Sequence, residues 1–146
     1  MIRWLTILIA LTSLAGCSEP FVVFSGGTLS GEERPPPEDW SALADEETVQ
    51  LETRPADPYS VNIWAVSVER DVYVATGADG TRWTGFIGQD PRVRLRVGQT
   101  LYPLRAVRVT DREEQEQVAR AYADKYELDP EDNWVREALV YRLEPR

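Results

Sequence analysis

Strict alternation over residues 92–97 limits the folds open to this chain more than any other feature. These residues read Arg-Val-Arg-Leu-Arg-Val, so every second side chain is apolar. Neighbouring side chains of a β-strand point to opposite faces, and the pattern therefore predicts a strand with one face on a core and one toward solvent. Gly98-Gln99-Thr100 follows and predicts a turn into a partner strand over residues 101–109.

Further strands are predicted over residues 48–53, 61–68, 72–76 and 139–143. The second and third of these segments are rich in valine and are separated by three polar residues, which predicts a hairpin. With residues 92–109, the chain therefore has two predicted hairpins and two further strands.

Helices are predicted between and around these strands. Residues 38–47 favour a short helix, residues 81–89 a helical turn, and residues 132–138 a short helical segment. The longest helix is predicted to open at Thr110, because Thr110 and Glu113 have the spacing of a capping box. The fold class is therefore mainly β with α (α+β), with one amphipathic helix after the second hairpin.

Composition bounds the chemistry. The 146 residues are 42% hydrophobic, which supplies a core for one domain, and carry a formal charge of −9, which is unsuited to binding nucleic acid. The sequence has no histidine and a single cysteine, Cys17. This excludes the Ser-His-Asp and Cys-His nucleophiles and most zinc and copper sites. The acidic pairs lack the pattern of a calcium loop, so no metal site is predicted.

The amino terminus has the layout of an exported protein. Arg3 precedes an apolar run over residues 5–14, which is too short to span about 30 Å of hydrocarbon. The run leads into Leu14-Ala15-Gly16-Cys17, which resembles the lipobox of bacterial lipoproteins. The resemblance implies a signal peptide over residues 1–16 and a lipid on Cys17. The alternative is an ordinary secreted protein in which the cysteine stands there by chance.

This layout predicts the organisation and location of the mature chain. Residues 17–37, which contain glycine, serine and three consecutive prolines, are predicted to form a lipidated flexible tether, and residues 38–146 to form the domain. The residue after Cys17 is Ser18 rather than the aspartate of inner-membrane lipoproteins. The expected location is the cell envelope, at the periplasmic face of the outer membrane if the organism is Gram-negative.

Four segments together resemble the flavin-binding split-barrel superfamily, in its pyridoxamine-phosphate-oxidase-like and deazaflavin-dependent-nitroreductase-like branches. They are residues 61–76, 81–95, 121–126 and 141–145, and the resemblance spans roughly residues 48 to 146. It implies an antiparallel split β-barrel. It also implies a homodimer, because cofactor sites in such proteins often lie at the subunit interface.

The resemblance also implies a place for FMN or a deazaflavin. Its phosphate would be held by Thr76, Thr81 and Arg82, and Trp64 and Trp83 would line the ring or shape the pocket. A phosphate dianion needs hydrogen bonds and positive charge together, which suits this set. The alternative is that the first three are ordinary turn and surface residues and that the two tryptophans are core anchors.

The three arginines of residues 92–97 form a second candidate site. Arg92, Arg94 and Arg96 share one strand face, where they could bind an anion such as a phosphate or an acidic polysaccharide. The alternative is a solvated face that balances the acidic helix around residues 113–116.

These observations favour a non-catalytic function. The expectation is a lipid-anchored envelope protein with a split-barrel-like binding domain and no resident cofactor, because a chain exported unfolded cannot carry a loosely held flavin with it. The alternative is an FMN- or deazaflavin-dependent oxidoreductase, in which the cofactor supplies the hydride chemistry. A third reading is a receptor for a small anion, built from Arg82 and the arginines of residues 92–97.

Overall fold

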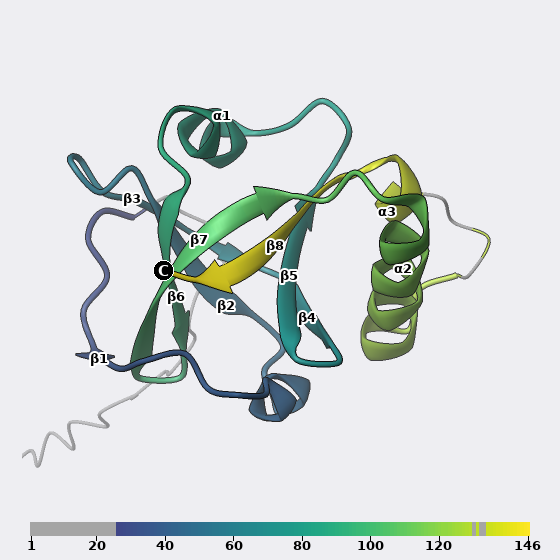
Figure 1. The fold of residues 1–146 in the computed structure, drawn as a ribbon, viewed down its shortest axis with the longest axis horizontal. Helices are drawn as coiled ribbons and strands as arrows, with labels where there is room; N and C mark the ends of the chain where they lie inside the picture. Colours follow the sequence, from purple (N-terminus) through teal and green to yellow (C-terminus); the bar gives the residue numbers. More distant parts are fainter. Residues whose placement is uncertain (1–25, 130, 132–133) are drawn as a thin grey trace, which may run out of the picture.

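The computed structural model describes residues 26–129, 131 and 134–146. Cys17 and the predicted signal peptide lie outside these residues. The elements in chain order are β1 (Glu32–Glu33), the 3-10 helix η1 (Ser41–Asp45), β2 (Val49–Thr53), β3 (Tyr59–Ile63), β4 (Ala65–Val68), β5 (Asp71–Thr76), α1 (Arg82–Gln89), β6 (Arg92–Val97), β7 (Thr100–Arg108), α2 (Arg112–Tyr126), α3 (Trp134–Glu137) and β8 (Leu139–Pro145) (Figure 1).

The strands form one curled sheet in the order β3-β2-β6-β7-β8-β5-β4, and β1 pairs with β7 in parallel. β3 and β4 lie at opposite ends of this order, although only Trp64 separates them in the sequence. The sheet must therefore curl until its two edges meet at one residue, which is the geometry of a split barrel. The predicted α+β split-barrel fold is confirmed.

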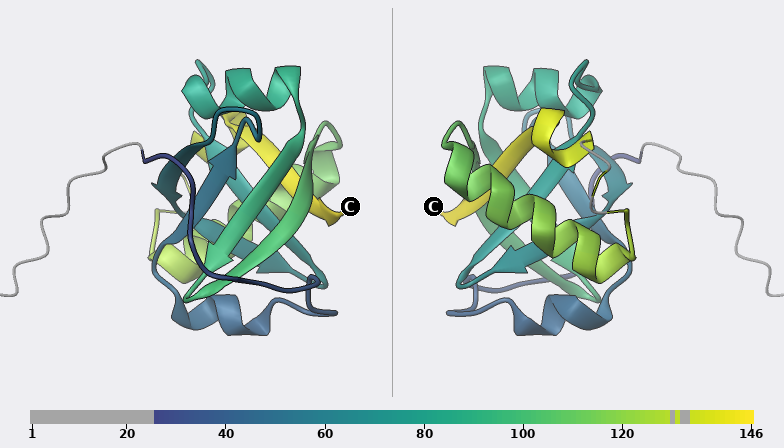
Figure 2. Two further views of the ribbon diagram at one scale, coloured as in Figure 1. Left: turned by 90° about the vertical axis from the view of Figure 1, so that its left-hand side faces the viewer. Right: turned by 90° about the vertical axis from the view of Figure 1, so that its right-hand side faces the viewer.

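Helices cover the two ends and one side of this barrel. In both views of Figure 2, α1 lies over one end and η1 over the other. Helix α2 packs against β4 and against α3. Among the described residues, no helix is both long enough and apolar enough to cross a membrane.

Two hydrophobic clusters follow from this arrangement. Val72 and Val74 of β5 point into the barrel, whereas Tyr73 and Ala75 point outward beneath α2 and α3, and all four are buried. Each fully buried side chain of this size contributes roughly 1.5–3 kcal/mol. Because residues 72–75 of β5 are covered on both faces, all four are apolar, whereas β6 faces the core on one side only and alternates.

The structure divides the strand predicted over residues 61–68. β3 ends at Ile63 and pairs with β2, whereas β4 begins at Ala65 and pairs with β5. The predicted hairpins are present as β4–β5 and β6–β7. Alternation identifies an extended segment but not its partners, so the change of partner at Trp64 has no signature in the local pattern.

The two best-defined helix starts also differ from prediction. The N-cap of α2 is Asp111 rather than Thr110, and its carboxylate accepts the N–H of Glu114 at 2.9 Å. A carboxylate at this position also interacts favourably with the helix dipole. The helix predicted over residues 38–47 is reduced to η1, before which the Asp39 carboxylate accepts the N–H of Ser41.

Residues 26–34, hereafter the strap, lie on the barrel, although the sequence places them in a flexible tether. Gly26 exchanges two main-chain hydrogen bonds with Ser60 of β3, and β1 pairs with β7. Leu29 between them is 8% exposed. The left-hand view of Figure 2 shows the strap, in dark blue, crossing the outside of the sheet. Its composition of glycine, serine and charged residues does not reveal these contacts, because they are made largely by the main chain.

Candidate functional site

The predicted phosphate-binding residues lie on one connection, between β5 and α1. Thr76 ends β5, and Thr81 and Arg82 begin α1. The main-chain N–H of Thr81 donates to Thr84 Oγ1 at 3.0 Å, and the Thr84 hydroxyl donates to the carbonyl of Thr81 at 2.8 Å. Arg82 is exposed and has no ion pair within the part of the chain that the structure describes.

The connection does not fit a flavin phosphate well. A dianion needs several free donors around it, but the main-chain N–H of Thr81 and the hydroxyl of Thr84 are already used at the helix start. The preceding Gly80 has a φ of +72°, and a Cβ there would approach Thr84 Oγ1 to 2.9 Å, so the turn is tightly closed on the helix start. Of the predicted set, the hydroxyls of Thr76 and Thr81 and the Arg82 guanidinium are left to meet an anion.

Trp64 and Trp83 lie in different environments. Trp83 is 4% exposed and belongs to the barrel core, where its ring meets Tyr141 edge-on at 5.6 Å. Trp64 is 40% exposed and stacks on Tyr126, with 4.3 Å between ring centroids. One tryptophan is therefore a core anchor, and the other forms part of an aromatic surface beside the split of the barrel.

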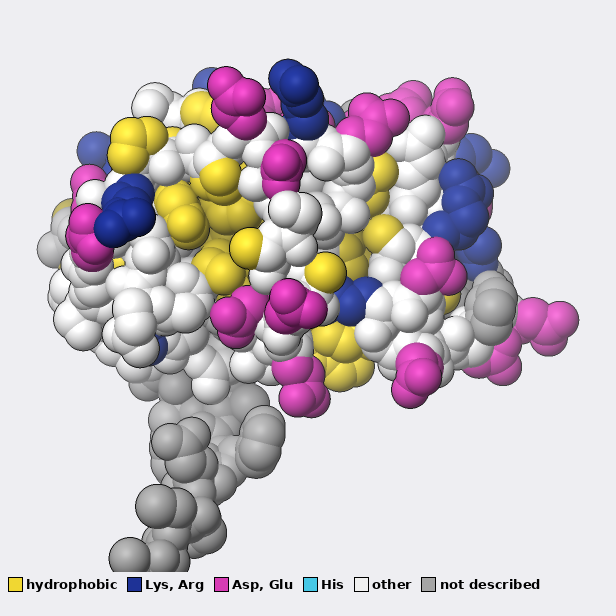
Figure 3. All heavy atoms as spheres, turned by 90° about the horizontal axis from the view of Figure 1, so that it is seen from below, with side chains coloured by type: hydrophobic (Ala, Val, Ile, Leu, Met, Phe, Trp, Pro, Cys, Tyr) yellow, Lys and Arg dark blue, Asp and Glu magenta, His cyan; other side chains and the backbone are white. Residues whose placement is uncertain are grey.

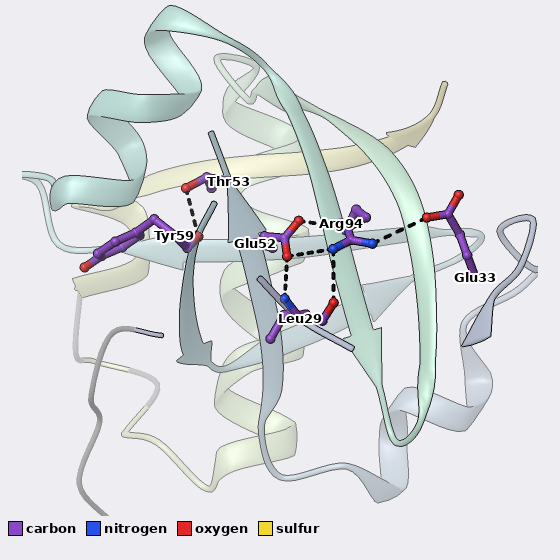
Figure 4. A network of polar contacts seen from close by, with 6 residues as sticks. All are labelled: Leu29, Glu33, Glu52, Thr53, Tyr59 and Arg94. Carbon is purple, nitrogen blue, oxygen red and sulfur yellow. Dashed lines mark hydrogen bonds and ion pairs between the residues drawn. The ribbon is translucent and has the colours of Figure 1, made fainter. Parts of the chain in front are cut away.

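The central arginine of residues 92–97 is engaged by a buried carboxylate (Figure 4). Arg94 Nε and Nη2 donate to the two oxygens of Glu52, each at 2.8 Å, from the neighbouring strand. Glu52 is only 5% exposed and also accepts the N–H of Leu29 at 2.6 Å. Arg94 Nη2 in turn donates to the Leu29 carbonyl. This cluster of Glu52, Arg94 and Leu29 holds the strap on the sheet, and its ion pair raises the pKa of Arg94.

The other two arginines also have oxygen partners. Arg92 forms an ion pair with Asp90 at 2.6 Å, and its hydrogen bonds lower the pKa of Asp90 to about 2. Arg96 donates to the carbonyl of Ser30 in the strap at 3.0 Å. The three guanidinium groups share a face as predicted, but each one is bonded to a different set of oxygen atoms of the chain.

A site that the sequence did not reveal lies at the split itself, which we call the seam. Three side chains near the end of α2 reach the main chain where β3 gives way to β4. Tyr122 donates its hydroxyl hydrogen to the carbonyl of Trp64 at 3.1 Å, and Tyr126 Oη accepts the N–H of Ala65 at 3.1 Å. Lys125 Nζ donates to the carbonyl of Ala65 at 2.8 Å and to that of Leu43 at 2.7 Å. Main-chain groups that the split would leave unpaired are thus satisfied by side chains.

A cavity of about 450 Å³ opens beside the seam, between η1, β4 and α2, and falls within the range of small-molecule sites. It is lined by Leu43, Ala44, Val66, Ser67, Ala121, Asp124 and Lys125. Figure 3, seen from the η1 side, shows hydrophobic side chains gathered on this face with acidic groups around them.

The ammonium of Lys125 gives the cavity a specific polar group. It has three N–H donors, and two of them are used on carbonyls. Burial lowers its pKa. The cavity can therefore offer an apolar wall and one charged donor to a ligand. The sequence did not reveal this role of Lys125, because the cavity is assembled from three segments far apart in the chain.

No cluster of three carboxylate or cysteine side chains that could hold a metal ion occurs within the described ranges. On the arginine face of β6, the carboxylates serve ion pairs: Glu52 binds Arg94, and Asp90 binds Arg92.

Solved structures share the fold at low sequence identity. A conserved hypothetical protein from Mycobacterium tuberculosis aligns with a TM-score of 0.60 and 18% identity, covering 71% of this chain and 76% of that protein. The heme storage protein HutZ from Vibrio cholerae aligns with a TM-score of 0.56 and 18% identity, covering 72% and 86%. An F420-H2 dependent reductase aligns with a TM-score of 0.55 and 15% identity, covering 68% and 95%. At these identities the similarity concerns the fold alone.

No curated protein matches the sequence. A family model does match residues 39–139, which include η1, the strands from β2 to β7, and α1 to α3. The chain therefore belongs to the DUF2255 family, described as uncharacterized proteins conserved in bacteria.

Proposed function

We propose that this chain is a lipid-anchored protein of the cell envelope whose split barrel binds a small ligand in the seam cavity without catalysing flavin chemistry. The observation that carries the binding role is the cavity itself, with its apolar wall and the free donor of Lys125. The lipid anchor rests on the sequence Leu14-Ala15-Gly16-Cys17.

The cavity supports one class of ligand best. Leu43, Val66 and Ala121 suit an apolar body, and the remaining N–H of Lys125 suits an acceptor or an anionic group at one end. The proposed ligand is therefore a small amphipathic molecule with one acidic or strongly accepting group. A binding role is supported by the similar structure of HutZ, which is described as a heme storage protein.

A fluorescent amphipathic anion, anilinonaphthalene sulfonate, tests the cavity directly. The protein is expected to bind it, and Ala121→Trp is expected to lower the affinity at least about tenfold, because the new ring fills the cavity. Arg120→Trp places the same ring on the next, exposed residue of α2 and is the matched control. Equal affinity in the two variants would contradict the binding site.

The second candidate is an FMN- or deazaflavin-dependent oxidoreductase, favoured by the similarity to an F420-H2 dependent reductase. The hydrogen bonds between Thr81 and Thr84 weigh against it, because they occupy the Thr81 main-chain N–H and the Thr84 hydroxyl, two donors at the helix start that a phosphate could otherwise use. We expect the natively purified protein to lack flavin absorbance and to bind neither FMN nor F420 at micromolar concentration. Saturable binding that Arg82→Gln abolishes would instead establish the cofactor role.

The proposed lipid anchor and the oligomeric state are tested by separate measurements. Mass spectrometry of the protein from membranes is expected to show a diacylated amino-terminal Cys17 and no residues before it. We further propose a homodimer, which sedimentation of the detergent-solubilised protein would detect. An unmodified chain that begins at Met1 would rule out the lipoprotein assignment while leaving the cavity untouched.

A further inference from the structure

Lys125 is set apart from the other basic residues by its chemistry. The chain has 16 lysine and arginine residues, and Lys125 is its one lysine. Arginine serves at every other basic position, including the exposed Arg120 of the same helix. A guanidinium stays protonated in proteins, whereas a lysine amine can lose its proton and act as a nucleophile. The one basic side chain with this capacity lines the seam cavity.

The main chain fixes the position of the Lys125 amine. Nζ lies 2.7 Å from the carbonyl oxygen of Leu43 and 2.8 Å from that of Ala65, so η1 and β4 hold it from two sides. The ammonium has three hydrogens, and the free amine has two. The free amine can therefore donate to both carbonyls and keep its lone pair at the remaining tetrahedral position, directed away from them.

The surroundings of the amine act on its charge in both directions, and burial has the largest effect. Burial lowers the pKa of Lys125, and the negative charge of Glu46 opposes this with a smaller effect. The ring of Tyr126, 5.1 Å from Nζ, also favours the charged form. Leu43 and Val66, which line the cavity, are almost completely buried. Proteins use a partly desolvated lysine beside an apolar wall as a nucleophile toward carbonyl compounds.

We propose that Lys125 forms an imine with a ligand that carries an aldehyde or ketone group on an apolar body. This inference rests on the proposed function, since the ligand occupies the same cavity, and it identifies the accepting group of that ligand as a carbonyl. The apolar lining takes up the body of the ligand and brings its carbonyl carbon to Nζ.

The reaction needs no oxidant, reductant or further reactant. The ammonium of Lys125 first gives one proton to solvent. The nitrogen then forms a bond to the carbonyl carbon, and the carbonyl oxygen leaves as water with one hydrogen from the nitrogen and one proton from solvent. The product is a protonated imine, which keeps one N–H for the carbonyl of either Leu43 or Ala65.

The alternative is a purely structural lysine that only supplies hydrogens to the two carbonyls. Such a lysine would react with a carbonyl compound no faster than a lysine on the surface. The sequence allows this comparison within one molecule, because Arg120→Lys introduces a second lysine on the exposed side of α2.

Reductive trapping tests the proposal in the full-length chain carrying Arg120→Lys. The probe is hexanal, and cyanoborohydride reduces each imine to a stable secondary amine, which peptide mapping assigns to its residue. We expect Lys125 to be alkylated at least about tenfold faster than the introduced lysine, because the cavity holds the aldehyde beside its amine. Equal or slower alkylation of Lys125 would overturn the proposal.

A second comparison tests whether the cavity directs the reaction. Ala121→Trp, which fills the cavity, is expected to slow the alkylation of Lys125 at least about tenfold, and Arg120→Trp to leave it nearly unchanged. Equal rates in these two variants would also overturn the proposal.

Binding of anilinonaphthalene sulfonate separates a failure of this inference from a failure of the proposed function. If Ala121→Trp weakens dye binding but Lys125 is alkylated no faster than the introduced lysine, the cavity binds ligands without a covalent bond and the imine is refuted. If the dye also binds equally to Ala121→Trp and Arg120→Trp, the binding site itself is refuted.

Discussion

The cluster of Glu52, Arg94 and Leu29 (hereafter the strap site) and the seam both provide hydrogen-bond partners for main-chain groups outside the regular strand pairing, but they differ in what they leave free. At the strap site, the buried Glu52 carboxylate accepts hydrogen bonds from Arg94 and from the N–H of Leu29, and Glu52 is only 5% exposed. At the seam, Lys125 and two tyrosines satisfy the main chain of Trp64 and Ala65 but leave a cavity, a spare donor and an exposed ring. A charged group whose hydrogen bonds are all made within the protein stabilises the fold. A charged group that keeps a free donor beside an apolar surface can also bind a ligand.

The largest loss of stability is expected from a substitution that disrupts the strap site. Glu52→Ala leaves Arg94 without its buried partner and the N–H of Leu29 without an acceptor. We expect the free energy of unfolding in urea to fall by about 3 kcal/mol. Glu33→Ala removes a more exposed carboxylate 3.5 Å from the same arginine and should cost less than about 1 kcal/mol. Similar losses in both variants would show that burial is not what distinguishes Glu52.

An intermediate effect is expected at the seam. Lys125→Met removes the donor to the carbonyls of Leu43 and Ala65 and should lower the free energy of unfolding by about 1–2 kcal/mol. The same variant should weaken binding of anilinonaphthalene sulfonate, whereas Glu52→Ala, measured where it is still folded, should not. Arg120→Met, on the exposed side of α2, is the control for both measurements. A loss of stability without a loss of dye binding would make Lys125 purely structural.

The smallest effect concerns the exposed pair of Asp90 and Arg92. The pKa of Asp90 is about 2 in the folded protein, against 3.8 for the free side chain, because Arg92 donates hydrogen bonds to it. Since the folded pKa is the lower one, the pair's contribution to stability is complete above pH 3.8 and disappears as the pH falls through about 2. An NMR titration of the Asp90 carboxyl measures this, and Arg92→Gln should return the pKa toward 3.8. An unchanged value in that variant would mean that another group holds the carboxylate ionised.

Local patterns predicted the parts of the fold that depend on neighbours in the chain. The alternation of residues 92–97 is read correctly because β6 has one core face and one polar face along its whole length. The break at Trp64 was not predicted, because the residues on both sides are extended and only their partners change. The N-cap was misplaced by one residue because Thr110 and Asp111 are both residues that can cap a helix.

The sites were less predictable than the fold. Glu52 stands at an outward position of an alternating strand, where a charged residue signals solvent, and only the strap makes it buried. The seam cavity has no signature either, since Leu43, Val66 and Lys125 come from three separate elements. Both sites arise from segments that meet only after the sheet has curled.

The strap also limits how far the barrel could lie from a membrane that holds a lipid on Cys17. With a lipid on Cys17 and a free chain up to Pro37, twenty residues of reach would let the domain move about 70 Å from the membrane. Because Gly26 is bonded to β3, a lipid on the proposed anchor Cys17 would be only nine residue steps from the barrel, a distance of at most about 30 Å. If Cys17 carries the proposed lipid, the barrel would meet only molecules that come close to the bilayer.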